Sequence, residues 1–188
     1  MIAPAWIWHR PQFIWNASAS VPIGLYRVEP GNGIGVADIA LVMPPEPLAS
    51  FVAARGYLPN GVPLLKRVLA LGGQTVCRRR TAIVVGGVTY GHARGRDGRG
   101  RALPVWQGCY VVAGDQVFLM NWDAADSFDG RYFGPLPLTS VIGRAVPVWT
   151  FDHALPAPNA SNDSVPGDLA QGSHYPSSTL TKGALQWP

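Results

Sequence analysis

The stretch LLKRVLAL, residues 64–71, decides how the rest of the chain is interpreted, because it carries Lys66 and Arg67 inside an apolar run. Its short apolar pattern is typical of a strand. On a strand, a lysine most often lays its stem along the surface and keeps its ammonium in water. A lysine in dry surroundings differs, because burial lowers the pKa of the amine and makes it a competent general base. The guanidinium of Arg67 does not lose its proton in this way.

Around this stretch the composition predicts a mostly β protein. The 188 residues include 22 Gly and 18 Pro, and only 14% are charged, against about 25% in an average globular protein. Frequent Gly and Pro between short apolar runs exclude a coiled coil, a helical bundle and a fully disordered chain. One helix is expected over Leu48–Tyr57, ended by Gly56 and Pro59. Strands are expected at Leu25–Val28, Ile39–Met43, Leu64–Leu71, Ala82–Val85, Val88–Tyr90, Tyr110–Val112, Gln116–Met120 and Val141–Trp149.

Turn residues predict two hairpins among these strands. Gly86-Gly87 separates two strand-like runs, as in a two-residue hairpin. Ala113-Gly114-Asp115 separates Tyr110–Val112 from Gln116–Met120 and is interpreted as a second hairpin.

Three segments are expected along the chain. Residues 1–15 are hydrophobic and include Trp6, Trp8 and Trp15, which predicts a strand packed on the domain, a membrane-surface segment that is the remnant or substitute of a membrane anchor, or both at once. Residues 16–150 form the folded domain. Residues 151–188 are rich in Pro, Ser, Asn and Gly without periodicity, which predicts a disordered tail.

Several kinds of chemistry lack their motifs. The chain has no G-x-S-x-G, no H-E-x-x-H and no Walker loop, and its two cysteines are too few for a metal site, so we expect no metal and no cofactor. Seven of the 15 basic residues lie between Arg78 and Arg101. Apart from Tyr90 this stretch lacks the aromatics that stack on nucleic acid, so no nucleic-acid partner is expected. It is either a solvated insertion or a surface for anionic lipid headgroups, and residues 92–101 are expected to be a mobile loop.

Two further stretches offer hydroxyl and charged groups. In NASASVPIGLY, residues 16–26, Ser18 and Ser20 lie two apart and face the same side of an extended chain. In DSFDGRYFGP, residues 126–135, Ser127 offers a hydroxyl, and Asp129 and Arg131 have the spacing of an ion pair. Taken alone, the first stretch is most simply a polar loop and the second a salt-bridged turn.

Together these stretches resemble a known family. The order S-x-S-x-P-x-G-L-Y, K-R-V-x-A-L-x-G, D-S-x-D-x-R-Y-F-G-P-L-P and I-G-x-A-x-P-x-W, from about residue 16 to residue 149, is similar to that of the type I signal peptidase (S26) clan. Within the clan it most resembles the TraF-type conjugal-transfer peptidases, since Ser-Val-Pro is one residue shorter than Ser-x-x-Pro. The resemblance implies coiled antiparallel β-sheets of the signal-peptidase and LexA-like type with one short helix.

The resemblance also implies a role for each motif residue. Ser20 corresponds to the nucleophile and Lys66 to the general base. Ser18 corresponds to the oxyanion-hole hydroxyl and Ser127 to the hydroxyl that orients the lysine. At the last two positions, Asp129 and Arg131 correspond to a structural ion pair.

The implied function is that of a membrane-associated serine endopeptidase at the periplasmic face of the bacterial inner membrane. Its substrate is an exported precursor, a conjugative propilin in this branch, which is cleaved or also cyclised. Its other partner is the inner-membrane surface. In that compartment Cys77 and Cys109 are expected to form a disulfide, the other interpretation being two buried thiols.

Three alternatives remain open at this point. The first is a general signal peptidase I that removes leader peptides. The second is a catalytically inactive pilus-assembly factor. Self-cleaving repressors also use a Ser-Lys dyad on a similar scaffold, but no DNA-binding domain fits before Asn16.

Overall fold

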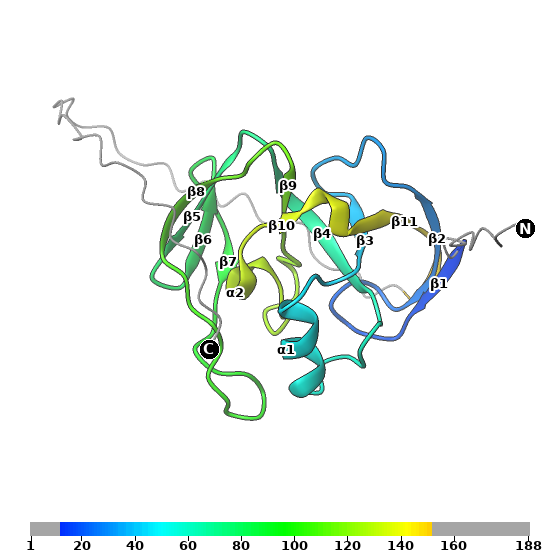
Figure 1. The fold of residues 1–188 in the computed structure, drawn as a ribbon, viewed down its shortest axis with the longest axis horizontal. Coiled ribbons are helices and arrows are strands. Elements are labelled where there is room, and N and C mark those ends of the chain that lie inside the picture. Colours follow the sequence, from blue (N-terminus) through cyan, green and yellow to red (C-terminus); the bar gives the residue numbers. More distant parts are fainter. Residues whose placement is uncertain (1–11, 152–188) are drawn as a thin grey trace, which may run out of the picture. The chain divides into compact units, whose positions relative to one another are not determined.

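The computed structural model describes residues 12–151, which form two antiparallel sheets (Figure 1). The larger sheet contains, in spatial order, β1 (Phe13–Asn16), β2 (Gly24–Pro30), β11 (Val141–Thr150), β3 (Ile39–Val42), β4 (Leu64–Leu71), β9 (Gln116–Leu119) and β10 (Leu136–Pro137). The smaller sheet contains β7 (Val88–His92), β6 (Ala82–Val85), β5 (Thr75–Arg79) and β8 (Gly108–Val111). Two short helices, α1 (Leu48–Ala54) and α2 (Gly130–Phe133), and a 3₁₀ turn at Leu138–Ser140 complete the fold. The expected mostly β fold is therefore confirmed.

Strand β4 contributes to two of the buried hydrophobic clusters. Leu65 belongs to a buried cluster of the larger sheet that also contains Val21 and Tyr26. Leu69, four residues further along the strand, belongs to the cluster beneath the smaller sheet, together with Phe118. Because side chains of β4 are buried in both of these clusters, the register of β4 is fixed. The position of Lys66 is therefore fixed as well.

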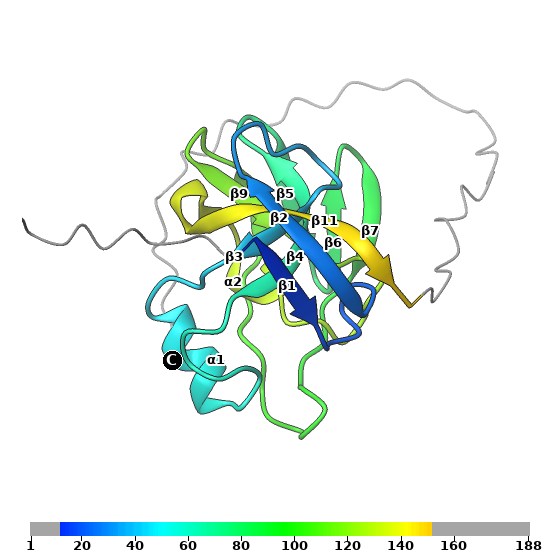
Figure 2. The ribbon, with the colours of Figure 1, turned by 90° about the vertical axis from the view of Figure 1, so that its right-hand side faces the viewer.

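One edge of the larger sheet lies at β1, whose partner strand within residues 12–151 is β2, in the register Trp15 opposite Leu25. Figure 2 shows β1, β2 and β11 side by side on the face turned to the viewer. Residues 13–15, assigned from the sequence to the N-terminal segment, thus belong to the sheet. Trp6, Trp8 and most of the predicted tail lie outside the described residues. Among the helices of residues 12–151, none has the length and hydropathy to cross a bilayer.

The first predicted hairpin is confirmed and the second is wrong. Gly86 and Gly87 both have positive φ, 57° and 83°, as a tight turn between β6 and β7 requires. At Ala113–Asp115 the chain does turn, but β8 pairs with β5 of the smaller sheet and β9 with β4 of the larger.

The reason is that the β4–β5 and β8–β9 connections each run between the two sheets and lie side by side. The amide of Gly73 donates to the carbonyl of Val112 at 2.8 Å, so the β4–β5 turn lies against the β8–β9 turn. A Cβ on Gly72 would lie 2.8 Å from Cα of Gly114, which makes glycine necessary at this approach. The local turn signal was correct, but this long-range contact decides which strands pair.

The helices are shorter and more numerous than expected. Helix α1 stops at Ala54 because Gly56 adopts φ of +62°, which lets Gly56 and Tyr57 donate back to the last turn. The stretch expected as a salt-bridged turn contains the single helical turn α2, capped by Asp129, whose carboxylate accepts from the amide of Arg131.

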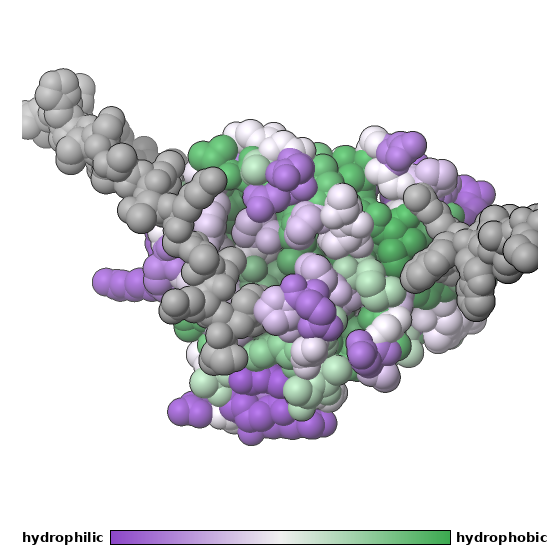
Figure 3. All heavy atoms as spheres, viewed as in Figure 1, coloured by the Kyte–Doolittle hydropathy of each residue, from purple (hydrophilic) through white to green (hydrophobic). Residues whose placement is uncertain are grey.

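The loop over residues 92–101 has fixed contacts, in contrast to the mobile loop expected from its composition. Its Asp97 carboxylate accepts from the Tyr57 hydroxyl at 2.7 Å, from Arg101 Nε at 2.8 Å and from the amide of Arg99 at 2.9 Å. The near absence of apolar residues predicted mobility, but one internal carboxylate organises the turn. The guanidinium-bearing residues Arg94, Arg96 and Arg99 are exposed, and Figure 3 shows hydrophilic residues gathered at the lower edge, where Figure 1 places this loop.

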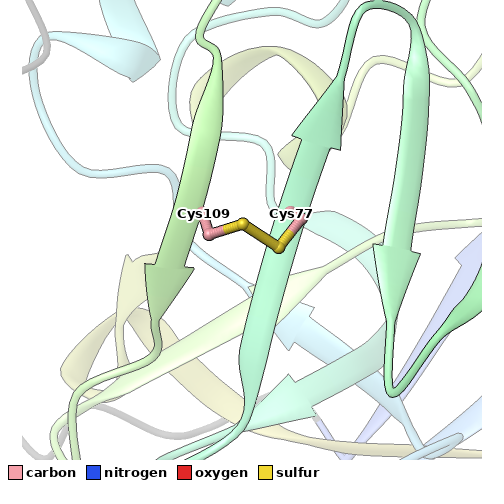
Figure 4. Close-up of a disulfide and its surroundings, with 2 residues drawn as sticks. All are labelled: Cys77 and Cys109. Carbon is pink, nitrogen blue, oxygen red and sulfur yellow. A yellow bond between two sulfur atoms is a disulfide. The ribbon is translucent and has the colours of Figure 1, made fainter. Parts of the chain in front are cut away.

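A disulfide joins Cys77 of β5 to Cys109 of β8 (Figure 4). The two residues are direct cross-strand partners, and their Cα atoms lie 4.0 Å apart. The bond therefore ties the edge strand of the smaller sheet to its neighbour.

We predict that the double substitution Cys77→Ser and Cys109→Ser lowers the free energy of unfolding. The loop closed by the bond has a sequence separation of 32 residues. Opening it costs about 3–4 kcal/mol in the loop-entropy model. Denaturant unfolding of the oxidised wild type and of the double variant measures the difference. Two free thiols in unreduced, denatured wild-type protein would contradict the bond.

Candidate active site

Strand β4 buries Lys66 and directs its amine to Ser127. Lys66 is 4% exposed, and its Nζ donates to Ser127 Oγ at 2.8 Å. Burial lowers the pKa of the Lys66 amine from 10.5 to about 8, against an opposing effect of the Asp129 carboxylate; Arg131 lowers it further and Asp126 raises it. About a tenth of the amine is therefore neutral at pH 7, and this neutral form is the one that a general base requires.

The surroundings of Lys66 are as dry as a lysine base needs. Its neighbours along β4, Leu64, Leu65 and Val68, are buried. Beside Ser127, the Phe128 ring stacks between Phe51 and Tyr132, with centroids 5.4 Å from each. The apolar run around Lys66 was evident from the sequence; the ring stack supplied by Phe51 and Tyr132 was not.

An ion pair beneath Ser127 holds the segment that carries it. Arg131 and Asp129 are almost completely buried, and two guanidinium nitrogens meet the two carboxylate oxygens at 2.9 and 2.8 Å. Nη2 of Arg131 also donates to the carbonyls of Ala124 at 2.6 Å and Ser127 at 3.2 Å. The expected pairing is present, and its spare donors fix the turn that presents Ser127.

Ser18 and Ser20 lie together on the β1–β2 loop. Their hydroxyl oxygens are 3.3 Å apart. Asn16, which is buried, organises this loop: its Oδ1 accepts from the amide and hydroxyl of Ser18, and its Nδ2 donates to the carbonyls of Ser18, Val21 and Pro22. No role for Asn16 was predicted from the sequence. An asparagine at the end of a strand, just before two serines, is nevertheless a typical signal of a side chain that hydrogen-bonds the following loop.

The structure thus forms two pairs, Ser18 with Ser20 and Lys66 with Ser127. They are brought near one another because Val21, next to Ser20, and Leu65, next to Lys66, pack in one buried cluster. Within residues 12–151, the lysine donates to Ser127, and no hydrogen bond joins it to Ser20.

Asn121 is the second residue that sequence reasoning missed. It is 1% exposed, and its side-chain amide donates to the carbonyl of Leu65 at 3.3 Å while its Oδ1 accepts from the amide of Arg67 at 2.8 Å. Both contacts flank Lys66. No local pattern points to this role, because the partners are more than 50 residues away in the chain.

Among the described residues, no group of three or more His, Cys, Asp or Glu side chains is placed to hold a metal ion. The polar groups gathered here are the hydroxyls of Ser18, Ser20 and Ser127 and the amine of Lys66.

Comparisons with known proteins identify the family of this chain. The family described as signal peptidase, peptidase S26, matches residues 2–150. A conjugal transfer protein TraF of Agrobacterium fabrum is 38% identical over 148 residues, which cover 73% of this chain and 82% of that protein. A plasmid transfer protein TraF of Escherichia coli is 33% identical over 145 residues, which cover 72% of this chain and 82% of that protein. A crystal structure of a signal peptidase I from Enterococcus faecalis aligns with a TM-score of 0.36 and 18% identity, over 61% of this chain and 97% of that chain.

The matched family is a class of serine peptidases of the signal peptidase type. This chain belongs to that family, peptidase S26, and it is similar to conjugal transfer proteins within it. The resemblance drawn from the four motifs is therefore confirmed, and a peptidase-like role in conjugation is supported.

We predict that Asp129→Asn lowers the free energy of unfolding by about 3–5 kcal/mol, because it leaves the buried Arg131 charge without its counter-ion. The matched control is Glu29→Gln, which breaks the surface pairs with Arg27 and Arg144. Such solvent-exposed pairs contribute little to stability, because water and salt screen them. Chemical denaturation of both variants tests this, and equal losses would contradict the structural role of the buried pair.

Proposed function

We propose that this chain is a serine endopeptidase in which Ser20 is the nucleophile and Lys66 is the general base. The observation that carries the proposal is the buried Lys66 amine, with its pKa lowered to about 8 and its hydrogen bond to Ser127. Ser20 is half-buried on the neighbouring loop, within reach of an incoming peptide. A Ser-Lys dyad needs no third member, since the amine takes the proton directly.

The first half of the reaction forms an acyl-enzyme. Rotation of the Ser20 side chain away from Ser18 brings its hydroxyl to the neutral Lys66 amine, which takes the proton as Oγ attacks the scissile carbonyl carbon. The Ser18 hydroxyl and the amide of Ser20 donate to the resulting oxyanion. The intermediate then collapses, the C–N bond breaks, and the Lys66 ammonium gives its proton to the leaving amine.

The second half resolves the ester. Lys66, neutral again, takes a proton from the attacking group, and the Ser20 hydroxyl is restored when the ester bond breaks. With water as the attacking group the product is a carboxylate. With the amino terminus of the substrate it is a cyclic peptide.

The substrate is proposed to bind as an added strand with small residues, such as Ala, beside the scissile bond. β9 pairs with β4 only from Val68 onward, so the stretch from Leu64 to Lys66 has a partner strand only on its β3 side among the described residues. The natural edges for the peptide are therefore residues 63–66 and residues 16–20, which flank Lys66 and Ser20.

The substrate class proposed is an exported precursor, most specifically a conjugative propilin. This rests on the chain's family and on its similarity to proteins named for conjugal and plasmid transfer. Removal of leader peptides in general, and an inactive assembly factor, are the competing outcomes of the tests below.

The proposed location is the periplasmic face of the inner membrane, with an aromatic patch on the membrane surface. This patch consists of Trp15, Trp149 and Phe151, each about half exposed. Their ring centroids lie 4.6–6.3 Å apart. Trp15 and Trp149 flank Leu25 from the two neighbouring strands, so they share one corner of the sheet. Exposed clustered Trp side chains are typical of a membrane–water interface.

We predict that cleavage of a precursor peptide depends on the neutral form of Lys66. The value of kcat/KM should rise with pH, with a midpoint near the Lys66 pKa of about 8, because deprotonation creates the base. Ser20→Ala and Lys66→Ala should each abolish cleavage and leave the circular dichroism spectrum unchanged. Lys182→Ala is the matched control and should retain wild-type activity. Full activity in Lys66→Ala would remove the dyad, and a folded wild type without activity on any precursor would favour the assembly factor.

We also predict that Trp149→Ser weakens binding to vesicles of phosphatidylethanolamine and phosphatidylglycerol by about ten-fold, the effect of withdrawing one large apolar side chain. Val105→Ser, a change at another exposed apolar residue, is the control. Co-sedimentation measures both. Equal binding of the two variants would exclude the aromatic patch as the contact.

A further inference from the structure

Asn121 takes the place of a strand residue beside Lys66. The β4–β9 ladder ends where the amide of Met120 donates to the carbonyl of Arg67 at 2.9 Å. Beyond this point the Asn121 side chain satisfies the amide of Arg67 and the carbonyl of Leu65. A single amide side chain thus replaces the next pair of backbone hydrogen bonds, at the two peptide groups on either side of Lys66.

The backbone of Asn121 is fixed by the buried ion pair. Its N–H donates to Asp129 Oδ2 at 3.0 Å, and its carbonyl accepts from Arg131 Nη2 at 3.3 Å. The same pair holds the turn that presents Ser127. Through Asn121, one ion pair therefore positions both the strand that carries Lys66 and the serine that receives its hydrogen bond.

We propose that Asn121 is a positioning residue that holds the β4 backbone on both sides of Lys66, so that the amine stays in register with Ser127 and shielded from water. This inference rests on the proposed function for its catalytic consequence, but not for its structural one. An amide suits the task because it offers one donor and one acceptor at the required spacing.

Because a side chain and not a further strand residue pairs with β4 here, the edge of β4 proposed to bind the substrate is not covered by β9. A further residue of β9 would pair with β4 and continue toward Pro63. The Asn121 amide satisfies the Leu65 carbonyl and the Arg67 amide and ends there, so within residues 12–151 no strand of the protein pairs with β4 on that side before Val68. Asn121 thus marks the boundary between the protein's own ladder and the one that the substrate is proposed to complete.

The charged groups near the Lys66 amine are known and do not change in the test. They are Asp129, Arg131 and Asp126. Replacing Asn121 by a neutral residue adds no charge, so a change in the Lys66 pKa reports altered position or hydration of the amine. Asn121→Asp is unsuitable, because its carboxylate would raise that pKa directly.

The test is a titration of the lysine side chains by NMR. The chain has two lysines, Lys66 and Lys182, so protein labelled with ¹³C at lysine Cε gives two signals, and Lys66→Ala assigns them. In Asn121→Ala we expect the Lys66 pKa to rise by about one unit toward its ordinary value, because the released strand lets water reach the amine. Asn32→Ala, at an exposed loop asparagine, is the control and should leave it unchanged.

Activity supplies the second readout. In Asn121→Ala the midpoint of the kcat/KM profile should move upward with the Lys66 pKa, which lowers kcat/KM near pH 7 about ten-fold. A folded Asn121→Ala with an unshifted Lys66 pKa overturns the proposal. If this variant does not fold, Asn121→Ser, which keeps one hydrogen-bonding oxygen, carries the same test and the same expected sign.

The NMR and kinetic readouts also separate the two proposals. If Asn121→Ala raises the Lys66 pKa but the wild type has no peptidase activity, the positioning role is supported and the proposed function is contradicted. An active wild type whose Asn121 variants keep both the Lys66 pKa and the pH midpoint supports the proposed function and contradicts the positioning role.

Discussion

The hydrogen bond between the buried Lys66 amine and the Ser127 hydroxyl is the interaction on which the site depends. Burying an ammonium is costly, and here the cost appears as a pKa lowered to about 8. A buried lysine of this kind contributes little to stability, but its lowered pKa makes the neutral amine, which can act as a base, more accessible. The fold keeps it there because β4 is anchored in two hydrophobic clusters, through Leu65 and Leu69.

Support for this lysine comes from polar groups that are themselves buried and satisfied. The Asp129–Arg131 pair holds the Ser127 turn, and Asn121 connects that pair to the backbone around Lys66. In the other half of the site, Asn16 shapes the β1–β2 loop, which carries Ser18 and Ser20. Two buried asparagines therefore define the two halves of the site, and an S26 signal peptidase fold supplies the sheet that joins them.

The sequence predicted the parts of this arrangement that depend on local chemistry. The apolar run around Lys66 and the Gly86-Gly87 turn lie where expected, since period and turn residues decide them. The pairing of β8 with β5, and the contacts of Asn16 and Asn121, were not predictable, because each depends on segments that meet only in the folded chain. The four motifs in order identified the family; none of them alone locates Ser20 relative to Lys66.

Trapping the acyl-enzyme tests the central claim most directly. The protein is incubated with a penem-type inhibitor that acylates serine peptidases of this kind, and the modified peptide is located by mass spectrometry. We predict one adduct on Ser20 in the wild type, formed faster as pH rises through 8, and none in Lys66→Ala. Modification of another residue, or equal labelling of Ser20 in Lys66→Ala, would contradict a serine activated by the buried amine.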